Sequence, residues 1–256
     1  KESRFVAITR DSWEGPVRES APDMVAHEEP LEIRLGTVPL AVVMRTPGHD
    51  EELAAGFLYS EGCIDGADDI AAMSKLGSAQ DPDNTLGIRL ASGTSLEDGR
   101  FASAQREFYA SSSCGICGKA TIEHILVGAP PLESPLRAAP ELLCSLPDKM
   151  RAAQATFEST GGLHAAALFT PGGELEVLRE DVGRHNAVDK VLGWRLLRDE
   201  VPVDNRILLV SGRAGFELVQ KALVARIGVM AAVGAPSSLA VDLAREGGMQ
   251  LVGFLR

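Results

Sequence analysis

The sequence predicts an α/β protein: an α+β N-terminal subdomain followed by a C-terminal three-layer αβα domain. Two observations support this prediction. Arg206–Val210 and Val229–Val233 are nearly continuous apolar runs, as expected of parallel strands covered on both faces. Each run is followed by a helical pattern, so strands and helices alternate toward the end of the chain. We predict three segments: a small α+β domain (1–110), a connector (111–147) and the αβα domain (148–256).

The first segment mixes short strands with one clear helix. Leu31–Leu35 and Val38–Arg45 are rich in β-branched and apolar residues, and Gly36-Thr37 between them predicts a hairpin. A helix follows over Glu51–Ser60, with Asp50 as the expected cap and Gly62 as its end. Further predicted strands are Phe5–Thr9, Leu86–Leu90 and Arg106–Tyr109.

The connector contains the sequence Ser113-Cys114-Gly115-Ile116-Cys117-Gly118-Lys119 and then a proline-rich stretch from Ala129 to Pro147. Beyond it the elements are longer. Predicted helices are Asp148–Ser159, Arg184–Arg198, Phe216–Ile227 and Ser238–Arg245, and predicted strands are His164–Thr170, Glu174–Arg179, Arg206–Val210, Val229–Val233 and Met249–Phe254.

Charge and hydropathy exclude some classes of function. The formal net charge of −11 argues against general nucleic-acid binding, which depends on Lys and Arg at phosphates. No run of about 18 apolar residues predicts a membrane span. Four cysteines in 256 residues do not make a disulfide scaffold, so we expect a cytoplasmic protein. The first residue is not Met, and we expect some residues to be missing at the start.

Cys114 and Cys117 are the principal candidate residues for chemistry. Glycines beside them expose backbone N–H groups and Lys119 adds positive charge, and both effects stabilise the nucleophilic thiolate. This spacing is compatible with metal ligation, dithiol–disulfide exchange or covalent sulfur transfer. Two buried structural cysteines are a further interpretation, and it is the one that we favour for Cys63 and Cys144.

Zinc and thioredoxin-like chemistry each lack a supporting feature. A closed zinc site needs four ligands, but Cys63 and Cys144 stand alone and His124 is the only nearby histidine. A thioredoxin-like CxxC lies between a strand and a helix early in a βαβ unit, whereas this one lies between two predicted domains. We therefore expect no bound metal.

Two turns of the last segment predict an anion site. Asp181-Val182-Gly183-Arg184-His185-Asn186 and Ser211-Gly212-Arg213-Ala214-Gly215 each lie between a strand and a helix. Free N–H groups at a helix start attract phosphate, and arginine adds bidentate charge. Consecutive crossovers place both turns at one sheet edge. Surface caps or ion pairs with Asp181 or Glu180 remain alternatives for the arginines.

His164 and His185 are candidate ligand contacts, with a hydrogen-bonded structural role as the alternative for each. His164 follows two glycines, which allow a ligand to approach the backbone closely. We interpret Asp181 as a cap and Asp189 as a solvated helix residue.

Several stretches together resemble the formate dehydrogenase accessory sulfurtransferases, the FdhD family. They include Thr46-Pro47-Gly48, Ser113-Cys114-Gly115-Ile116-Cys117-Gly118, Gly162-Leu163-His164-Ala165-Ala166, the block Glu180 to Lys190 (EDVGRHNAVDK), Val210-Ser211-Gly212-Arg213 and Leu251-Val252-Gly253-Phe254.

The resemblance implies that a cysteine desulfurase supplies sulfur as a persulfide on Cys114, with Cys117 in support. The sulfur would pass to the molybdenum (or tungsten) bis(molybdopterin guanine dinucleotide) that formate dehydrogenase requires, and a guanine nucleotide could mimic this ligand. Cofactor-binding residues would be His164, Arg184, His185, Ser211, Gly212, Arg213, Phe254, Leu255 and Arg256. We also expect a homodimer and a family tail beyond Arg256.

The resemblance further implies a cytidine-deaminase-like second domain. Deaminases place zinc ligands at two adjacent helix starts. The corresponding positions here contain Arg184-His185-Asn186 and Ser211-Gly212-Arg213-Ala214, without a cysteine, so deaminase chemistry is not expected. A dithiol–disulfide oxidoreductase and a noncatalytic cofactor chaperone are the competing functions.

Overall fold

The structure is a computed structural model that describes residues 3–11, 18–77, 83–92, 130–133 and 135–256. The described part is mixed α/β, with six α-helices, one 3-10 turn (Ala67–Asp69) and three sheets. None of its helices is both long and apolar enough to cross a membrane. Side chains are described from residue 23 onward.

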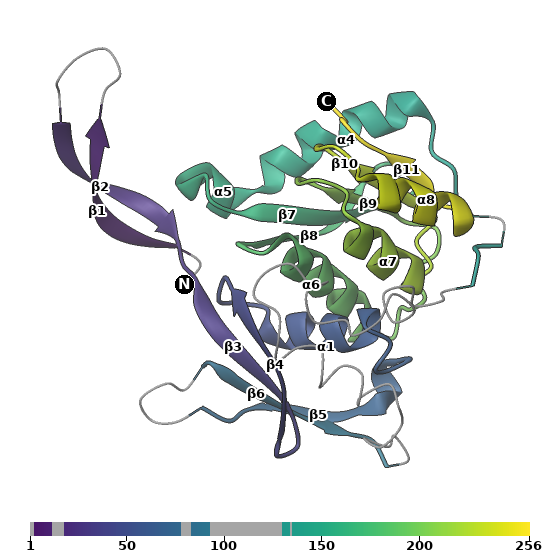
Figure 1. Ribbon diagram of the computed structural model, residues 1–256, viewed down its shortest axis with the longest axis horizontal. Helices are drawn as coiled ribbons and strands as arrows, with labels where there is room; N and C mark the ends of the chain where they lie inside the picture. Colours follow the sequence, from purple (N-terminus) through teal and green to yellow (C-terminus); the bar gives the residue numbers. More distant parts are fainter. Residues whose placement is uncertain (1–2, 12–17, 78–82, 93–129, 134) are drawn as a thin grey trace.

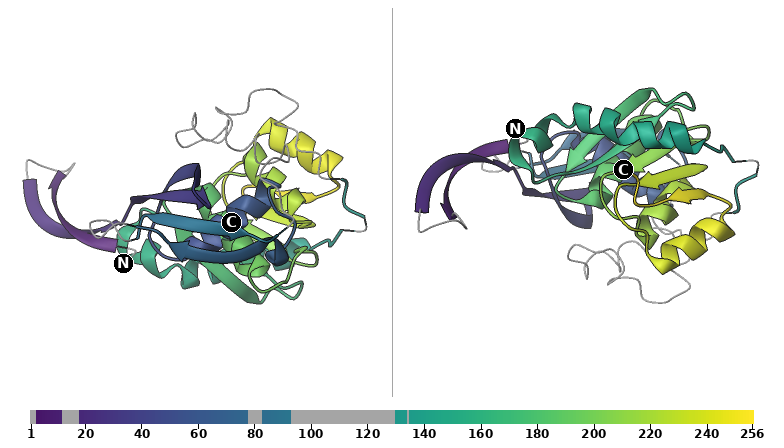
Figure 2. Two further views of the ribbon diagram at one scale, coloured as in Figure 1. Left: turned by 90° about the horizontal axis from the view of Figure 1, so that it is seen from below. Right: turned by 90° about the horizontal axis from the view of Figure 1, so that it is seen from above.

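The first two strands, β1 (Ser3–Asp11) and β2 (Arg18–Ala26), pair only with each other, as an antiparallel ribbon. The ribbon projects from the rest of the molecule in all three ribbon views (Figures 1 and 2). The sequence predicted part of β1 and missed β2, which contains Pro22 and several charged residues.

A four-stranded sheet forms the base of the molecule (Figure 1). Its order is β4-β3-β6-β5, in which β3 pairs antiparallel with β4 and parallel with β6. The predicted hairpin is confirmed, because Gly36 has φ 60° between β3 and β4. The strands are β3 (Glu29–Leu35), β4 (Val38–Arg45), β5 (Ile70–Lys75) and β6 (Thr85–Leu90).

Helix α1 (Asp50–Ser60) covers the inner face of this sheet. Asp50 is not its cap as predicted: the cap is His49, and the Asp50 carboxylate pairs with Arg45 instead. Gly62, at φ 70°, follows the helix end as expected.

A five-stranded sheet forms the second half, in the order β11-β10-β9-β7-β8. Strands β9, β10 and β11 are parallel, as the apolar runs predicted, whereas β7 runs antiparallel to both β8 and β9. The strands are β7 (His164–Phe169), β8 (Leu175–Asp181), β9 (Ile207–Val210), β10 (Val229–Ala232) and β11 (Gln250–Val252).

Helices cover both faces of the five-stranded sheet (Figure 1). Alternate residues of β7 show this directly: Ala166 and Leu168 join the core on the α6 side, and Ala165, Ala167 and Phe169 join the core under α4. The helices are α4 (Pro140–Ala153), α5 (Ala155–Thr160), α6 (Arg184–Leu196), α7 (Phe216–Val224) and α8 (Ser238–Glu246).

Helix α4 begins earlier than the predicted Asp148. Pro140 is at its first position, which has no need of an N–H donor, and Pro147 lies inside the helix. The predicted helix over Asp148–Ser159 is divided at Gln154 into α4 and α5.

One core cluster joins the two sheets through α1 and α6. A Cβ on Gly56 would lie 1.8 Å from the carbonyl oxygen of Asp189, and a Cβ on Gly193 would lie 1.8 Å from that of Glu52. Only glycines permit so close a crossing. This cluster is a single group of buried side chains from both halves of the chain, the first being Leu31 and the last Met249.

Candidate ligand-binding site

The two predicted turns do meet at one edge of the five-stranded sheet. Because β7 runs antiparallel to both β8 and β9, those two strands end at the same edge, and the turns that follow them carry Arg184 and Gly212 close together. Strand β7 runs the other way, so its first residue, His164, reaches this edge too. The N–H of Ala165 donates to Ser211 Oγ at 2.8 Å, which fixes the loop after β9.

Gly212 lies between His164 and Arg184. A Cβ at Gly212 would stand 3.3 Å from His164 Nδ1 and 3.9 Å from Arg184 Cδ. The sequence prediction that these residues share one edge is therefore correct. Glycine leaves the imidazole and the arginine stem room that a larger residue would fill.

Burial lowers the pKa of His164 below its ordinary value of 6.5, and the neighbouring Arg184 and His185 lower it further. His164 is therefore a neutral imidazole at neutral pH. In that form it offers one N–H donor and one ring-nitrogen acceptor to a ligand.

A pocket of about 550 Å³ opens beside His164 and Ser211. Its other wall is formed by α4 and α5, an aromatic and cationic surface that the sequence analysis did not single out. Arg151 stacks on the Phe157 ring there, with its guanidinium carbon 4.2 Å from the ring centroid. The lining is Pro147, Asp148, Met150, Arg151, Gln154, Phe157, Gly161, Gly162, Leu163, His164, Ser211 and Val233.

The last residues of the chain run along the same edge. The N–H of Phe254 donates to the Gly234 carbonyl (3.0 Å), and the N–H of Leu255 donates to the Ala232 carbonyl (3.1 Å). Phe254 is 64% exposed and Arg256 is exposed, whereas Leu255 packs into the core under α4. Of the three predicted contact residues, Leu255 is therefore the one whose side chain is buried.

His185 and Arg213 occupy different surroundings. Arg213 is exposed and free of ion pairs among the described residues. His185 is largely buried, and its Nε2 lies 2.6 Å from Oε2 of Glu217 on α7. Cys114 and Cys117 lie outside the described residues, and so does the strand predicted over Arg106–Tyr109.

The EDVGRHN block also has a structural role beneath the site. Asp181 is fully buried and is not the cap of α6, which is Gly183. Its carboxylate receives N–H groups from Thr46 (3.1 Å), Gly183 (2.8 Å) and Asn186 (2.9 Å). Lys190 Nζ lies 2.7 Å from its carboxylate and donates to the Thr46 carbonyl at 2.9 Å. The block thus holds the Thr46-Pro47-Gly48 turn against α6.

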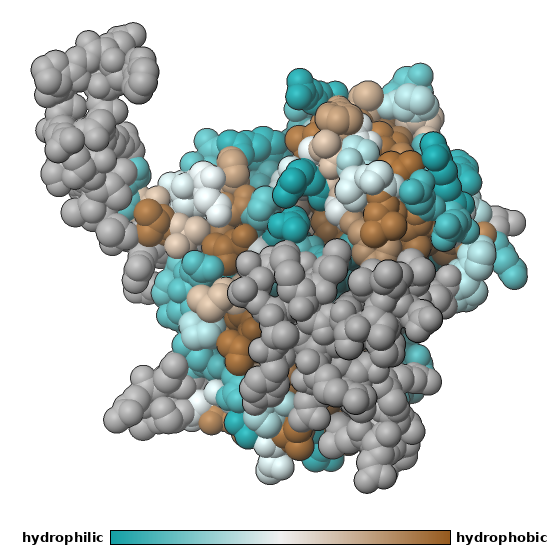
Figure 3. Space-filling model, in the orientation of Figure 1, coloured by the Kyte–Doolittle hydropathy of each residue, from teal (hydrophilic) through white to brown (hydrophobic). Residues whose placement is uncertain are grey.

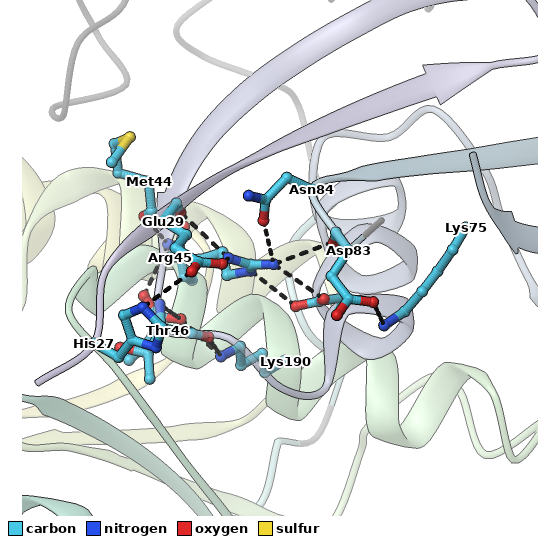
Figure 4. A network of polar contacts seen from close by, with 12 residues as sticks. His27, Glu29, Met44, Arg45, Thr46, Lys75, Asp83, Asn84 and Lys190 are labelled. Carbon is cyan, nitrogen blue, oxygen red and sulfur yellow. Dashed lines mark hydrogen bonds and ion pairs between the residues drawn. The ribbon is translucent and has the colours of Figure 1, made fainter. Parts of the chain in front are cut away.

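Figure 4 shows the neighbouring part of this polar layer, centred on the buried guanidinium of Arg45. Arg45 pairs with Asp50 (3.0 Å) and Glu29 (3.4 Å) and donates to Asn84 Oδ1 (3.1 Å). The layer joins β3, β4, α1 and the start of β6. The Arg45 and Asp50 side chains at its centre are buried, so their ion pair helps to fix the position of the turn after β4.

The prediction that Asp189 is a solvated helix residue is wrong. Asp189 is 2% exposed, and it accepts from Ser60 Oγ (2.7 Å) and from Lys221 Nζ (3.1 Å). Burial raises the pKa of Asp189, although the adjacent Lys221 opposes that change. Its partners come from α1 and α7, far away in the sequence, so no local pattern could reveal them.

No group of three or more potential metal ligands (His, Cys, Asp or Glu) comes together in the described ranges. Fold and site thus define an α/β protein built on two larger sheets, with a candidate ligand-binding edge that is lined by arginine, histidine and glycine.

Comparison with known proteins makes the assignment more specific. Residues 26–256 match the FdhD/NarQ family, and the chain belongs to that family. A sulfur carrier protein FdhD from Streptomyces avermitilis is 54% identical over 242 residues, covering 92% of this chain and 85% of the relative. One from Mycolicibacterium paratuberculosis is 49% identical over 241 residues, covering 92% of this chain and 88% of the relative.

The fold has a solved counterpart as well. The crystal structure of a candidate formate dehydrogenase accessory protein from Desulfotalea psychrophila superposes with a TM-score of 0.76 at 26% identity. The match covers all of this chain and 94% of the other.

Proposed function

We propose that this protein is a sulfur carrier that accepts persulfide sulfur from a cysteine desulfurase and delivers it to a molybdenum (or tungsten) bis(molybdopterin guanine dinucleotide). Formate dehydrogenase would receive the finished cofactor. Sulfur-carrier relatives at about half identity support this proposal. The single structural observation that carries it is the convergence of His164, Arg184 and Gly212 beside a pocket of about 550 Å³.

The residues at this edge suit a ligand that contains both phosphate groups and flat aromatic rings. Arg184 and Arg213 would pair with phosphate oxygens, and the N–H groups at the starts of α6 and α7 would add to that attraction. The pocket beside His164 and Ser211, with Phe157 in its wall, would accept a flat pterin or guanine ring. Such use of the edge agrees with the cytidine-deaminase-like architecture that we propose for the second domain.

The first sulfur transfer is a thiolate displacement. The Cys114 thiolate attacks the outer sulfur of the desulfurase persulfide, forming a new S–S bond while the old one breaks and the desulfurase cysteine leaves as a thiolate. The Cys117 thiolate would then attack the inner sulfur on Cys114, forming a Cys114–Cys117 disulfide and releasing the outer sulfur at the sulfide level for the metal as its sulfido ligand. An external thiol reductant would restore the two thiols before the next cycle. We further propose that this happens in the cytoplasm, on a homodimer.

Mass spectrometry tests the carrier step. After incubation with desulfurase and cysteine, the wild-type protein should gain the mass of one sulfur atom, and Cys114→Ala should not. Cys63 is buried as predicted, whereas the prediction of a buried Cys144 is wrong, because this thiol is exposed on α4. Cys144→Ala is therefore the matched control and should keep the adduct. An adduct that survives Cys114→Ala, or none on the wild type, would overturn the proposal.

Restoration of formate dehydrogenase activity in cells separates the competing functions. A sulfur carrier loses this activity with Cys114→Ala, whereas a noncatalytic chaperone keeps it. A dithiol oxidoreductase would instead form a reversible Cys114–Cys117 disulfide and no persulfide.

A further inference from the structure

The pair formed by His185 and Glu217 has a feature that a surface ion pair lacks. Glu217 Oε2 lies 2.6 Å from His185 Nε2, and the two side chains are only 13% and 19% exposed. The other carboxylate oxygen, Oε1, is buried without any hydrogen-bond partner. Within the described ranges it is the one buried side-chain oxygen or nitrogen in that condition.

An unpartnered buried carboxylate oxygen costs folding free energy, because it has lost water without gaining a donor. The buried acids Asp181 and Asp189, by contrast, use both of their oxygens. A carboxylate kept only for stability would be expected to resemble these two. The cost at Glu217 therefore indicates a role in function.

The location of Glu217 and His185 indicates what this role is. Glu217 is in the first turn of α7, directly after the Ser211-Gly212-Arg213 loop, and His185 is in the first turn of α6 beside Arg184. Both helix starts belong to the proposed ligand edge. His185 is also close enough to His164, which lines the pocket, to influence it electrostatically.

We propose that Glu217 is a positioning residue for this edge, an inference that rests on the proposed function. Its carboxylate oxygen Oε2 lies 2.6 Å from His185 Nε2, so a neutral imidazole would carry its proton on that nitrogen. Nδ1, which has no partner among the described residues, is then an acceptor for an N–H group of the bound ligand. Pterin and guanine both present such groups on the amino-oxo-pyrimidine edge that the two ring systems share.

The first measurement is the tautomer of His185 by long-range ¹H–¹⁵N NMR, with no ligand added. The wild type should show a single Nε2–H form. Glu217→Leu, which has no acceptor, should show a mixture, and Glu217→Gln should restore the single form because its amide oxygen accepts. An unchanged tautomer in Glu217→Leu would overturn the proposal.

The second measurement is calorimetric binding of GDP, with ADP as the comparison nucleotide. Loss of the orienting hydrogen bond in Glu217→Leu should weaken GDP binding by about tenfold, and Glu217→Gln should recover most of it. Glu141→Leu is the matched control, since Glu141 is an exposed first-turn glutamate on α4, and it should bind as the wild type does.

Thermal unfolding separates positioning from a purely structural role. Glu217→Leu removes the unpartnered oxygen, so its unfolding temperature should not fall even though GDP binding weakens. A lowered unfolding temperature with unchanged GDP affinity would overturn the proposal. If the wild type bound no GDP, the proposed function would fail, and the tautomer would still decide the role of Glu217.

Discussion

Lys190 Nζ lies 2.7 Å from Asp181 Oδ2, and neither side chain has more than 1% of its area exposed. The two charges belong to different elements, α6 and the end of β8, and together they hold the turn after β4. The pair therefore helps to hold the two halves of the molecule together.

We predict that Lys190→Met destabilises the protein by about 3–5 kcal/mol, because it leaves the Asp181 carboxylate buried without its counter-charge. Urea unfolding measures the loss. The double variant Lys190→Met with Asp181→Asn should recover part of the stability. The exposed pair Lys75–Asp83 provides the control, and Lys75→Met should change stability little. Equal losses in the two lysine variants would contradict a special role for the buried pair.

Gly56→Ala should destabilise the protein by at least about 1–3 kcal/mol, the usual cost of overpacking. The new methyl group would overlap the Asp189 carbonyl, so α1 and α6 would have to separate. Gly66→Ala is the matched control, because a Cβ there meets nothing within 4 Å. Chemical denaturation of the two variants makes the comparison. A fully stable Gly56→Ala protein would mean that the two helices do not cross as closely as described.

The lowered pKa of Glu52 predicts that part of the stability of the protein is lost in acid. Burial alone would raise its pKa, but hydrogen bonds from Arg179 (2.6 and 2.9 Å) and His49 bring the pKa down from 4.5 to about 2. The folded state therefore binds this proton less readily than the unfolded state does. The stabilisation is complete above pH 4.5 and disappears as the pH falls toward 2.

Urea midpoints of the wild type and Glu52→Gln between pH 7 and pH 2.5 should therefore converge as the pH falls. The exposed neighbour Glu51 serves as the control, and Glu51→Gln should run parallel to the wild type. A constant gap between wild type and Glu52→Gln would show that the Arg179 contact does not set the pKa of Glu52.

Gly212→Ala should weaken GDP binding by several-fold while leaving stability nearly unchanged. The added methyl group would press on His164 Nδ1 at 3.3 Å, in the space that we assign to the ligand. Gly215→Ala, in the same loop, adds a methyl group to open space and should bind GDP normally. Calorimetry measures the GDP affinity of both variants. Normal binding by Gly212→Ala would place the ligand elsewhere.

The second half of the chain was largely predictable because its signals are local. Continuous apolar runs marked β9 and β10, and glycine-containing turns marked where those strands end. The same local reasoning brought Arg184 and Gly212 to one edge correctly, since parallel strands present their ends together.

Other features depend on contacts that are distant in the sequence. β5 reads IAAMSK, with a single β-branched residue, and it is a strand because it pairs with β6. Asp189 is charged, but it is buried because Ser60 and Lys221 meet it from other helices. The helix predicted over Asp148–Ser159 covers most of the pocket wall formed by α4 and α5, but the earlier start of α4 was missed, because the proline-rich stretch up to Pro147 was interpreted as a connector.

The position of the candidate ligand contacts has a consequence for protein engineering. Ser211 and Arg184 stand just beyond the ends of β9 and β8, and all four residues of β9 are buried. Substitutions in these loops are therefore expected to change ligand specificity without destabilising the fold. A library confined to residues 211–213 and 184–185 would explore new specificities on a scaffold that still folds.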